Sequence, residues 1–269
     1  DGIIMHHKNS KNSFYKIFGD AEIIEKIISK NLPQDTYELI HTNEFIKDTD
    51  SALGAAKRGK NTSMWLAVDS VKNKDSNVII SAGNTGALFV IAKLNLKMIE
   101  NIDKPALSGL WPNKIGTNIV LDLGASIDCN EKNLTDFSLM GSALFKALFP
   151  DENPKVALLN IGSEEIKGNE TIKNTYKTLI NQNNKIYEFK GYIEGNEIMN
   201  GDVNVIVTDG FTGNIALKTA EGTANFITNE LKKIMLGTLL GKISSFININ
   251  NIRSFKKRLD PRLYNGAIL

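Results

Sequence analysis

Apolar and polar positions along the chain form two kinds of segment that alternate. Short runs rich in β-branched and aromatic residues predict strands, and longer segments with apolar residues at helical spacing predict helices. The predicted strands are 14–18, 37–41, 77–81, 118–123, 155–160 and 204–208, and the predicted helices include 21–30, 64–73, 85–100 and 134–148. The last four strand runs are apolar without alternation, which is typical of a parallel sheet covered by helices on both faces. The pattern predicts an α/β fold.

The pattern changes after about Thr228. Residues 230–259 have helical spacing, with an interruption around 247–252 and no strand between. We therefore predict an α/β body at 1–227, a basic amphipathic helical appendage at 228–262 and a return to the body at 263–269. We also expect both ends to be incomplete, because the sequence starts at Asp1 and stops at an apolar Leu269.

Composition adds limits to this picture. Of the 269 residues, 42% are hydrophobic and 23% are charged, which supports a sizeable core and excludes intrinsic disorder. A net charge of +2 gives no overall reason to expect nucleic acid as a partner. The single cysteine excludes a disulfide framework and favours a reducing cytoplasm.

Two strand ends carry the same short motif. Residues 80–86 and 207–213 both place Gly-x-Thr-Gly after an apolar run and before a predicted helix. Glycine allows close backbone approach, and a helix N-terminus attracts an anion, so two such loops predict a phosphate or carboxylate held between them. Tight strand-to-helix turns are the alternative. The residues that we assign to this cradle are Ser81, Gly83, Asn84, Thr85, Gly86, Asp209, Gly210, Thr212 and Gly213, with Asp209 expected chiefly to shape its loop.

Two further strand ends add polar and charged groups. Residues 160–168 contain Asn160, Gly162 and Lys167, and a cation at Lys167 can reach the same anion. The alternative for Lys167 is a solvated surface lysine. Asp122 follows another predicted strand, where an aspartate is as often a turn or cap residue as a site group.

Several other kinds of site are not supported. Residues 54–61 nearly match a P-loop, but Asn61 stands where Ser or Thr must reach Mg²⁺ and no strand precedes the motif. No Gly-x-Gly occurs, and the histidines lack metal-ligand spacing. Cys129 has no nearby histidine and is expected to be an inert thiol. We expect no metal, no cofactor and no covalent nucleophile.

Five motifs together resemble one family. They are Ser-Ala-Gly-Asn-Thr-Gly-Ala at 81–87, Leu-Asp-Leu-Gly-Ala at 121–125, Leu-Leu-Asn-Ile-Gly at 158–162, Glu-Ile-Lys-Gly at 165–168 and Asp-Gly-Phe-Thr-Gly-Asn at 209–214. In this order they closely resemble PlsX, the bacterial acyl-ACP:phosphate acyltransferases of phospholipid synthesis, from about Phe14 to Leu269. Ser126 departs from the family's usual Asn. The family's Asp-x-x-Gly-Gly-Asp loop and Lys-His-Gly segment are expected outside this sequence.

The resemblance implies a Rossmann-like three-layer α/β/α sandwich, related to isopropylmalate dehydrogenases and phosphate acetyltransferases, and a homodimer. It implies transfer of a fatty acyl group from acyl carrier protein to inorganic phosphate without a cofactor. By the same resemblance, Lys167 and Asn214 are the catalytic pair. Phosphate is an adequate nucleophile for a thioester once it is positioned, so the residues are compatible with this reaction.

The charge is unevenly distributed along the chain. Residues 228–262 carry eight basic and two acidic residues, a net charge of +6 that leaves −4 on the rest. The same segment is rich in apolar residues, which suits an anionic membrane surface or the acidic carrier protein. Packing in the helical bundle of a dimer is the alternative. The surface residues that we single out are Leu239, Leu240, Lys242, Phe246, Arg253, Lys256 and Lys257. The resemblance likewise implies a cytoplasmic protein at the membrane periphery.

Three other functions stay open at this point. A phosphate acetyltransferase-like enzyme that uses acyl-CoA would not need the basic helical end. A non-catalytic scaffold for carrier protein at the membrane would not need an anion cradle. An oxidoreductase of the related dehydrogenase fold would need a nucleotide site and a carboxylate cluster, and the sequence offers neither.

Overall fold

The computed structural model describes residues 2–182, 185–258 and 267–268. The chain divides into two compact units, residues 1–100 and 101–269, and each is described here by itself. The predicted division at 227/228 falls inside one continuous helix, α8 (Gly210–Leu236), and most of 263–269 lies outside the described residues. The domain limits drawn from the sequence therefore stay a prediction.

The first unit pairs two short parallel strands and surrounds them with helices. Strands β1 (Tyr15–Gly19) and β2 (Tyr37–His41) align Ile17 with Leu39. The helices are α1 (Gly2–Asn9), α2 (Ala21–Ile28), α3 (Ala52–Lys57), α4 (Ser63–Lys72) and α5 (Thr85–Leu96), with a 3₁₀ turn, η1, at Gln34–Thr36. Asp20 and Thr62 cap α2 and α4, as their side-chain oxygens and positions predict.

The strand predicted at 77–81 is absent from the described first unit. These residues are irregular, and the side chains of Val78 and Ile80 are 70% and 92% exposed. An apolar run becomes a strand only when a neighbour pairs with its backbone, and the sheet of this unit contains β1 and β2 alone among the described residues. The prediction was wrong because hydrophobicity does not encode the pairing partner.

The second unit contains a six-stranded sheet in the order β6-β5-β7-β4-β3-β8. Strands β4 (Thr117–Leu121), β5 (Lys155–Leu159), β6 (Glu188–Ile193) and β7 (Val205–Val207) run parallel. Strand β3 (Leu107–Pro112) runs antiparallel to β4 and to the short β8 (Ala267–Ile268). The parallel core is confirmed. Strands β3 and β6 were not predicted; in β6, charged residues and a glycine interrupt the apolar positions.

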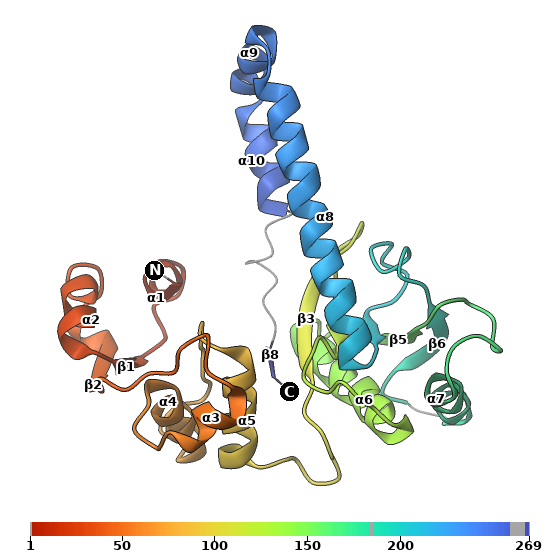
Figure 1. Ribbon diagram of the computed structural model, residues 1–269, viewed down its shortest axis with the longest axis horizontal. Coiled ribbons are helices and arrows are strands. Elements are labelled where there is room, and N and C mark those ends of the chain that lie inside the picture. Colours follow the sequence, from red (N-terminus) through yellow and green to blue (C-terminus); the bar gives the residue numbers. More distant parts are fainter. Residues whose placement is uncertain (1, 183–184, 259–266, 269) are drawn as a thin grey trace. The chain divides into compact units, whose positions relative to one another are not determined.

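Helices cover both faces of this sheet, which gives three layers (Figure 1). On one face α6 (Glu131–Leu148) and α7 (Glu170–Asn181) pack over the sheet, and Phe137 and Leu179 join the buried cluster of Leu121, Leu158 and Val207. On the other face, residues 216, 217 and 220 of α8 pack against a second cluster. Burial of these apolar side chains on both faces is the main stabilisation of the layers.

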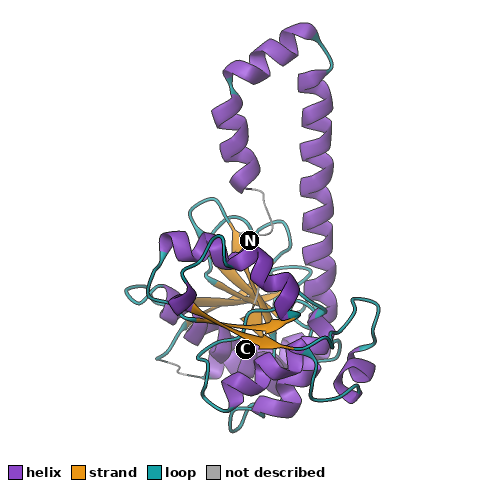
Figure 2. Ribbon diagram, turned by 90° about the vertical axis from the view of Figure 1, so that its left-hand side faces the viewer, coloured by secondary structure: helices purple, strands orange, loops and turns teal. Residues whose placement is uncertain are grey.

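Helix α8 continues far beyond the sheet. As Figure 2 shows, α9 (Leu239–Ile247) turns back at its distal end and α10 (Ile249–Arg258) runs back toward the sheet. We call residues 228–258 the helical arm. The hydroxyl of Thr238 accepts the Gly241 N–H and caps α9, so the first break comes at 237–238, where none was predicted. The second break, at Asn248, falls within the predicted interruption at 247–252.

Candidate active site

The C-terminal ends of β5, β7 and β4 lie at one edge of the second unit's sheet. The three strands are parallel neighbours, so the loops that follow them, 160–168, 208–214 and 122–126, gather at that edge. Open parallel sheets bind ligands at this edge. We refer to these three loops as the site edge. The loop at 81–86 belongs to the first unit and is described separately below.

Asn160 fastens the loop that carries Lys167. Its amide nitrogen donates to the carbonyl oxygens of Gly162 and Lys167, at 3.1 and 3.2 Å, so one side chain links the two ends of the loop. Gly168 adopts a φ of +92°, and a Cβ there would lie 2.5 Å from the Asn160 Oδ1. Glycine is needed at 168 because both the backbone conformation and the close contact exclude a side chain. The geometry gives Asn160 a structural use, and its predicted contact with substrate stays a prediction.

Lys167 is exposed at the site edge. The stem of its side chain lies over Gly162, where a Cβ would come within 3.0 Å of the Lys167 Cγ. Within residues 2–182 and 185–258, Lys167 forms no ion pair. An exposed ammonium on a fastened loop is suited to attract and orient an anion.

Asp209 shapes the start of α8, as the sequence indicated. Its Oδ1 accepts the Thr212 N–H at 2.8 Å, and its Oδ2 accepts the Thr212 hydroxyl at 2.8 Å. Gly210 and Gly213 are buried against the 122–126 loop: a Cβ on Gly210 would lie 2.7 Å from the Ser126 carbonyl oxygen, and one on Gly213 would overlap the carbonyl oxygen of Asp122. These glycines therefore allow a helix to lie directly against a loop.

Asp122 organises the site edge from inside. Its buried carboxylate accepts backbone N–H groups from Leu107, Gly124, Ala125 and Ser126, at 2.6–3.1 Å. Burial raises the pKa of this carboxyl group, and the four N–H donors act in the opposite direction. The turn role that the sequence left open is the one observed. The carbonyl of Ser126 in turn accepts the Gly210 N–H at 2.9 Å, so position 126 acts through its backbone.

Asn214 lies in the first turns of α8. Its side chain is exposed and lies beside Gly124. A Cβ on Gly124 would come within 3.5 Å of the Asn214 side chain, and the φ of Gly124 is +134°. The structure brings Asn214 and Lys167 to the same sheet edge through adjacent strands, β7 and β5. Their catalytic roles stay predictions.

Cys129 lies beside the same edge in a chemically quiet environment. Its thiol donates to the Ser126 carbonyl at 3.5 Å, and burial raises its pKa to about 11. A thiol with this pKa is almost entirely protonated at neutral pH. The geometry supports the expectation of an inert thiol.

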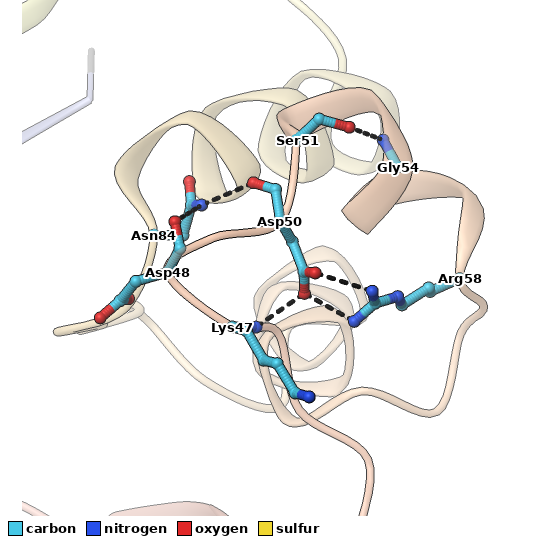
Figure 3. A network of polar contacts seen from close by, with 7 residues as sticks. All are labelled: Lys47, Asp48, Asp50, Ser51, Gly54, Arg58 and Asn84. Carbon is cyan, nitrogen blue, oxygen red and sulfur yellow. Dashed lines mark hydrogen bonds and ion pairs between the residues drawn. The ribbon is translucent and has the colours of Figure 1, made fainter.

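The loop at 81–86 is held by a different device (Figure 3). The Asn84 Oδ1 accepts the Ala87 N–H at 3.0 Å and caps α5, while its amide nitrogen donates to the carbonyls of Asp48 and Asp50 at 3.2 and 3.0 Å. The Gly83 N–H donates to the Ser81 hydroxyl at 3.3 Å. Residues 81, 83, 85 and 86 are exposed, so this loop is open to solvent within its own unit.

The two Gly-x-Thr-Gly motifs are not structurally equivalent. In the first, the cap residue Asn84 lies inside the motif, so α5 begins at Thr85. In the second, the cap residue Asp209 precedes the motif, so α8 begins at Gly210. The matching letters are therefore displaced by two positions relative to the helix start, a difference that a comparison of letters alone does not reveal.

The arm exposes the apolar residues that the sequence singled out. The side chains of Leu239, Leu240 and Phe246 are 76%, 80% and 79% exposed, and Lys242 and Arg253 are also exposed. Lys256 and Lys257 lie in α10, but their side chains are outside the described set. Across the part of the chain that the structure describes, no helix combines the length and apolar character needed to cross a bilayer.

A family model for fatty acid synthesis proteins matches residues 1–269, the whole chain. The chain belongs to this family. It is the PlsX family that the five motifs resemble, and its members are acyltransferases. A phosphate acyltransferase of Pelagibacter ubique is 70% identical over 268 residues, covering this chain in full and 80% of the relative. One from Paramagnetospirillum magneticum is 41% identical over 270 residues, covering this chain in full and 76% of the relative.

Two solved structures share the fold. The EutD phosphotransacetylase from Staphylococcus aureus superposes with a TM-score of 0.60 at 17% identity, covering 83% of this chain and 78% of its own. A phosphotransacetylase from Streptococcus pyogenes gives 0.54 at 17% identity, covering 77% and 72%. At this identity the likeness shows the fold, and the predicted Rossmann-like α/β/α sandwich of the phosphate acetyltransferase type is confirmed.

Proposed function

We propose that this acyltransferase moves a fatty acyl group from acyl carrier protein to inorganic phosphate, and that the acyl phosphate then serves acylation of glycerol 3-phosphate in phospholipid synthesis. A phosphate oxygen attacks the thioester carbonyl carbon and forms a tetrahedral intermediate. The C–S bond then breaks, and the phosphate proton passes to the departing thiolate. Acyl phosphate and the free carrier thiol are the products. All atoms are balanced without a cofactor or a covalent enzyme intermediate.

In this proposal each polar group at the site edge has one task. The Lys167 ammonium binds phosphate and orients one oxygen toward the thioester. The Asn214 amide donates to the oxyanion that develops on the carbonyl, where a preorganised donor is most effective. We also propose that the loop at 81–86, in the first unit, binds phosphate through its exposed backbone and hydroxyl donors.

The observation that carries the proposal is the contrast between Lys167 and its neighbours. The loop around it is fastened by Asn160, yet the ammonium has no ion-pair partner among the described residues. Lys173, six positions later, lies 2.9 Å from Glu170 on the surface of α7. A fastened loop that presents an unpaired cation at the ligand-binding edge of a sheet is the arrangement that an anionic substrate requires.

The decisive experiment follows acyl phosphate, trapped with hydroxylamine, from acyl-ACP and phosphate. Lys167→Ala is expected to lower kcat/KM about 10²–10³-fold, the usual effect of losing one transition-state donor. Lys167→Arg is expected to recover part of the loss because the charge is kept. Lys173→Ala is the matched control and is expected to keep normal activity. Near-normal activity of Lys167→Ala would contradict the proposal.

Asn214 is tested in the same assay. Asn214→Ala removes the amide donor, and Asn214→Asp replaces it with an acceptor that repels the developing oxyanion. We expect losses of about 10²-fold for the first and more for the second, with the thermal midpoint of both variants unchanged, since the side chain is exposed. Equal activity of the two variants would remove the oxyanion role.

The acyl donor needs its own comparison. Side-by-side assays with acyl-ACP and acyl-CoA of the same chain length are expected to favour acyl-ACP in kcat/KM. A preference for acyl-CoA would replace the proposed donor and indicate a phosphate acetyltransferase-like enzyme. Carrier binding without turnover of either donor would indicate a scaffold instead.

We further propose that the helical arm contacts an anionic membrane surface and that the protein is a homodimer. Exposed Leu239, Leu240 and Phe246 beside basic Lys242 and Arg253 suit a surface with apolar depth and negative charge. Leu239→Glu with Phe246→Glu is expected to abolish co-sedimentation with phosphatidylglycerol vesicles. Ile180→Glu, an exposed apolar position on α7, is the control. Unchanged vesicle binding would overturn the membrane contact. Light scattering tests the proposed homodimer, and loss of the dimer in the double variant would indicate that these residues pack between protomers.

A further inference from the structure

The segment that failed as a P-loop has a different use in the structure. Arg58, in the middle of that segment, points back to Asp50 and forms a two-pronged ion pair with its carboxylate. The guanidinium Nη1 and Nη2 lie 2.6 and 2.7 Å from the two carboxylate oxygens. The Asp50 side chain is only 9% exposed, so this pair is less screened by solvent than the other ion pairs of the unit.

Asp50 belongs to a short strap, residues 47–51, that crosses the start of α5. Its carboxylate also accepts the N–H of Lys47 at 2.8 Å, which closes the strap into a turn. At the other side, the backbone carbonyls of Asp48 and Asp50 accept both hydrogen bonds from the Asn84 amide nitrogen. Figure 3 shows this sequence of contacts, from Arg58 through Asp50 to Asn84.

Packing supports the same connection. A Cβ on Gly86 would lie 3.5 Å from the Ala52 Cβ, so the residue just after the strap touches the first turn of α5. Ala55 of α3 and Ala87 of α5 are fully buried in one cluster with Met64 and Val68 of α4. The strap is therefore held between α3 and α5, and its position fixes where Asn84 can sit.

We propose that Asp50 and Arg58 are positioning residues for the Gly83–Gly86 loop, acting through the strap and Asn84. The inference rests on the phosphate-binding role proposed above for this loop. It gives Asn84 the task of joining the strap to the helix start. It also makes Arg58 a structural arginine whose effect on catalysis is indirect, since its guanidinium is engaged by Asp50.

The test combines phosphate kinetics with hydrogen exchange on the full chain. Asp50→Asn and Arg58→Gln are expected to raise the KM for phosphate about tenfold with kcat changed less than about twofold, because the loop is misplaced while Lys167 is untouched. Amide exchange at Ala87 is expected to accelerate, because the cap hydrogen bond from Asn84 is weakened. Arg58→Lys, which keeps the charge and loses the fork, is expected to lie between these variants and wild type.

Asp69→Asn is the matched control, since Asp69 lies 3.9 Å from Lys72 at a partly exposed position of α4, and it is expected to change neither quantity. Normal exchange at Ala87 in folded Asp50→Asn and Arg58→Lys would overturn the inference. Faster exchange with an unchanged KM for phosphate would uphold the strap and reject the phosphate role of the loop. If Asp50→Asn does not fold, Arg58→Lys decides between the outcomes by the same two measurements.

Discussion

The loops at 81–86 and 209–214 share three letters, the Gly, Thr and Gly of one motif, and are built in opposite ways. The first is exposed and is held by side chains: Asn84 reaches the strap, and Arg58 holds the strap through Asp50. The second forms the start of α8 and is held by backbone packing: Gly210 and Gly213 are buried, and Gly213 lies against the carbonyl of Asp122. The comparison teaches that a shared glycine motif does not imply a shared reason for glycine.

The two loops should also differ in the substitutions that they tolerate. A loop held by side-chain hydrogen bonds loses order gradually as single bonds are removed, each contributing about 0.5–1.5 kcal/mol. A loop that relies on direct backbone contact has no space for an added methyl group, and any side chain forces the helix away. Substitutions of comparable size should therefore give very different results in the two loops.

Gly213→Ala is expected to have the largest effect. The new Cβ would overlap the Asp122 carbonyl oxygen, which cannot move without breaking the hydrogen bonds of the buried carboxylate. We expect a loss of about 3 kcal/mol or more in the free energy of unfolding, at the upper end for overpacking. Urea denaturation measures it. A loss below about 1 kcal/mol would show that α8 is not seated against this loop.

Cys129 gives a chemical measure of the same tight region. With its pKa at about 11 instead of its ordinary 9.0, the thiolate fraction at pH 8 falls about 100-fold, and alkylation by iodoacetamide should slow at least as much. Unfolding in urea should restore the rate. Because the thiol pKa is higher in the folded protein, this group stabilises the fold fully below about pH 9, and the contribution is lost as pH rises toward about 11. Equal alkylation rates in native and unfolded protein would contradict the packing.

Asn84→Ala probes the loop held by side chains. It removes the α5 cap and both hydrogen bonds to the strap, and we expect a loss of about 1–2 kcal/mol. Asn84→Asp keeps the acceptor for the cap and removes the donors to the strap, so it is expected to recover about half of the stability. If Asn84→Asp were as stable as wild type, the strap bonds would contribute nothing.

Gly86→Ala is expected to have the smallest effect and completes the comparison with Gly213→Ala. Its Cβ would meet the Ala52 Cβ at 3.5 Å, an ordinary van der Waals contact, and alanine favours the helix. We expect a thermal midpoint within about 2 °C of wild type. A strong destabilisation here would mean that both motifs need glycine for the same reason.

Much of the second unit could be predicted from sequence because its signals are local. The apolar runs of β4, β5 and β7 are buried on both faces, and Asp209 precedes its helix as a cap residue should. The run at 77–81 has the same composition, but whether it forms a strand depends on a partner. Likewise, Asp122 and Asn160 were chosen for their position at strand ends, and only the fold shows that their polar atoms are directed at neighbouring backbone groups.

The Asp50–Arg58 pair could not be predicted from the sequence for a related reason. Eight positions separate the two residues, across the turn and short helix of α3, a spacing that no periodic rule connects. Arg58 was considered only as part of a failed nucleotide motif. A buried carboxylate of this kind becomes visible only after the helices have been placed.

The unbroken course of α8 has a mechanical consequence. Its 27 residues, at 1.5 Å each, form a rod about 40 Å long. Its first turns are seated against the 122–126 loop and, at residues 216, 217 and 220, against the sheet, so the part beyond residue 220 is a lever about 24 Å long. A tilt of about 5° of this part displaces its far end by about 2 Å. Conversely, a force on α9 acts at the far end of this lever. It therefore produces a large torque but only a small displacement near Asn214.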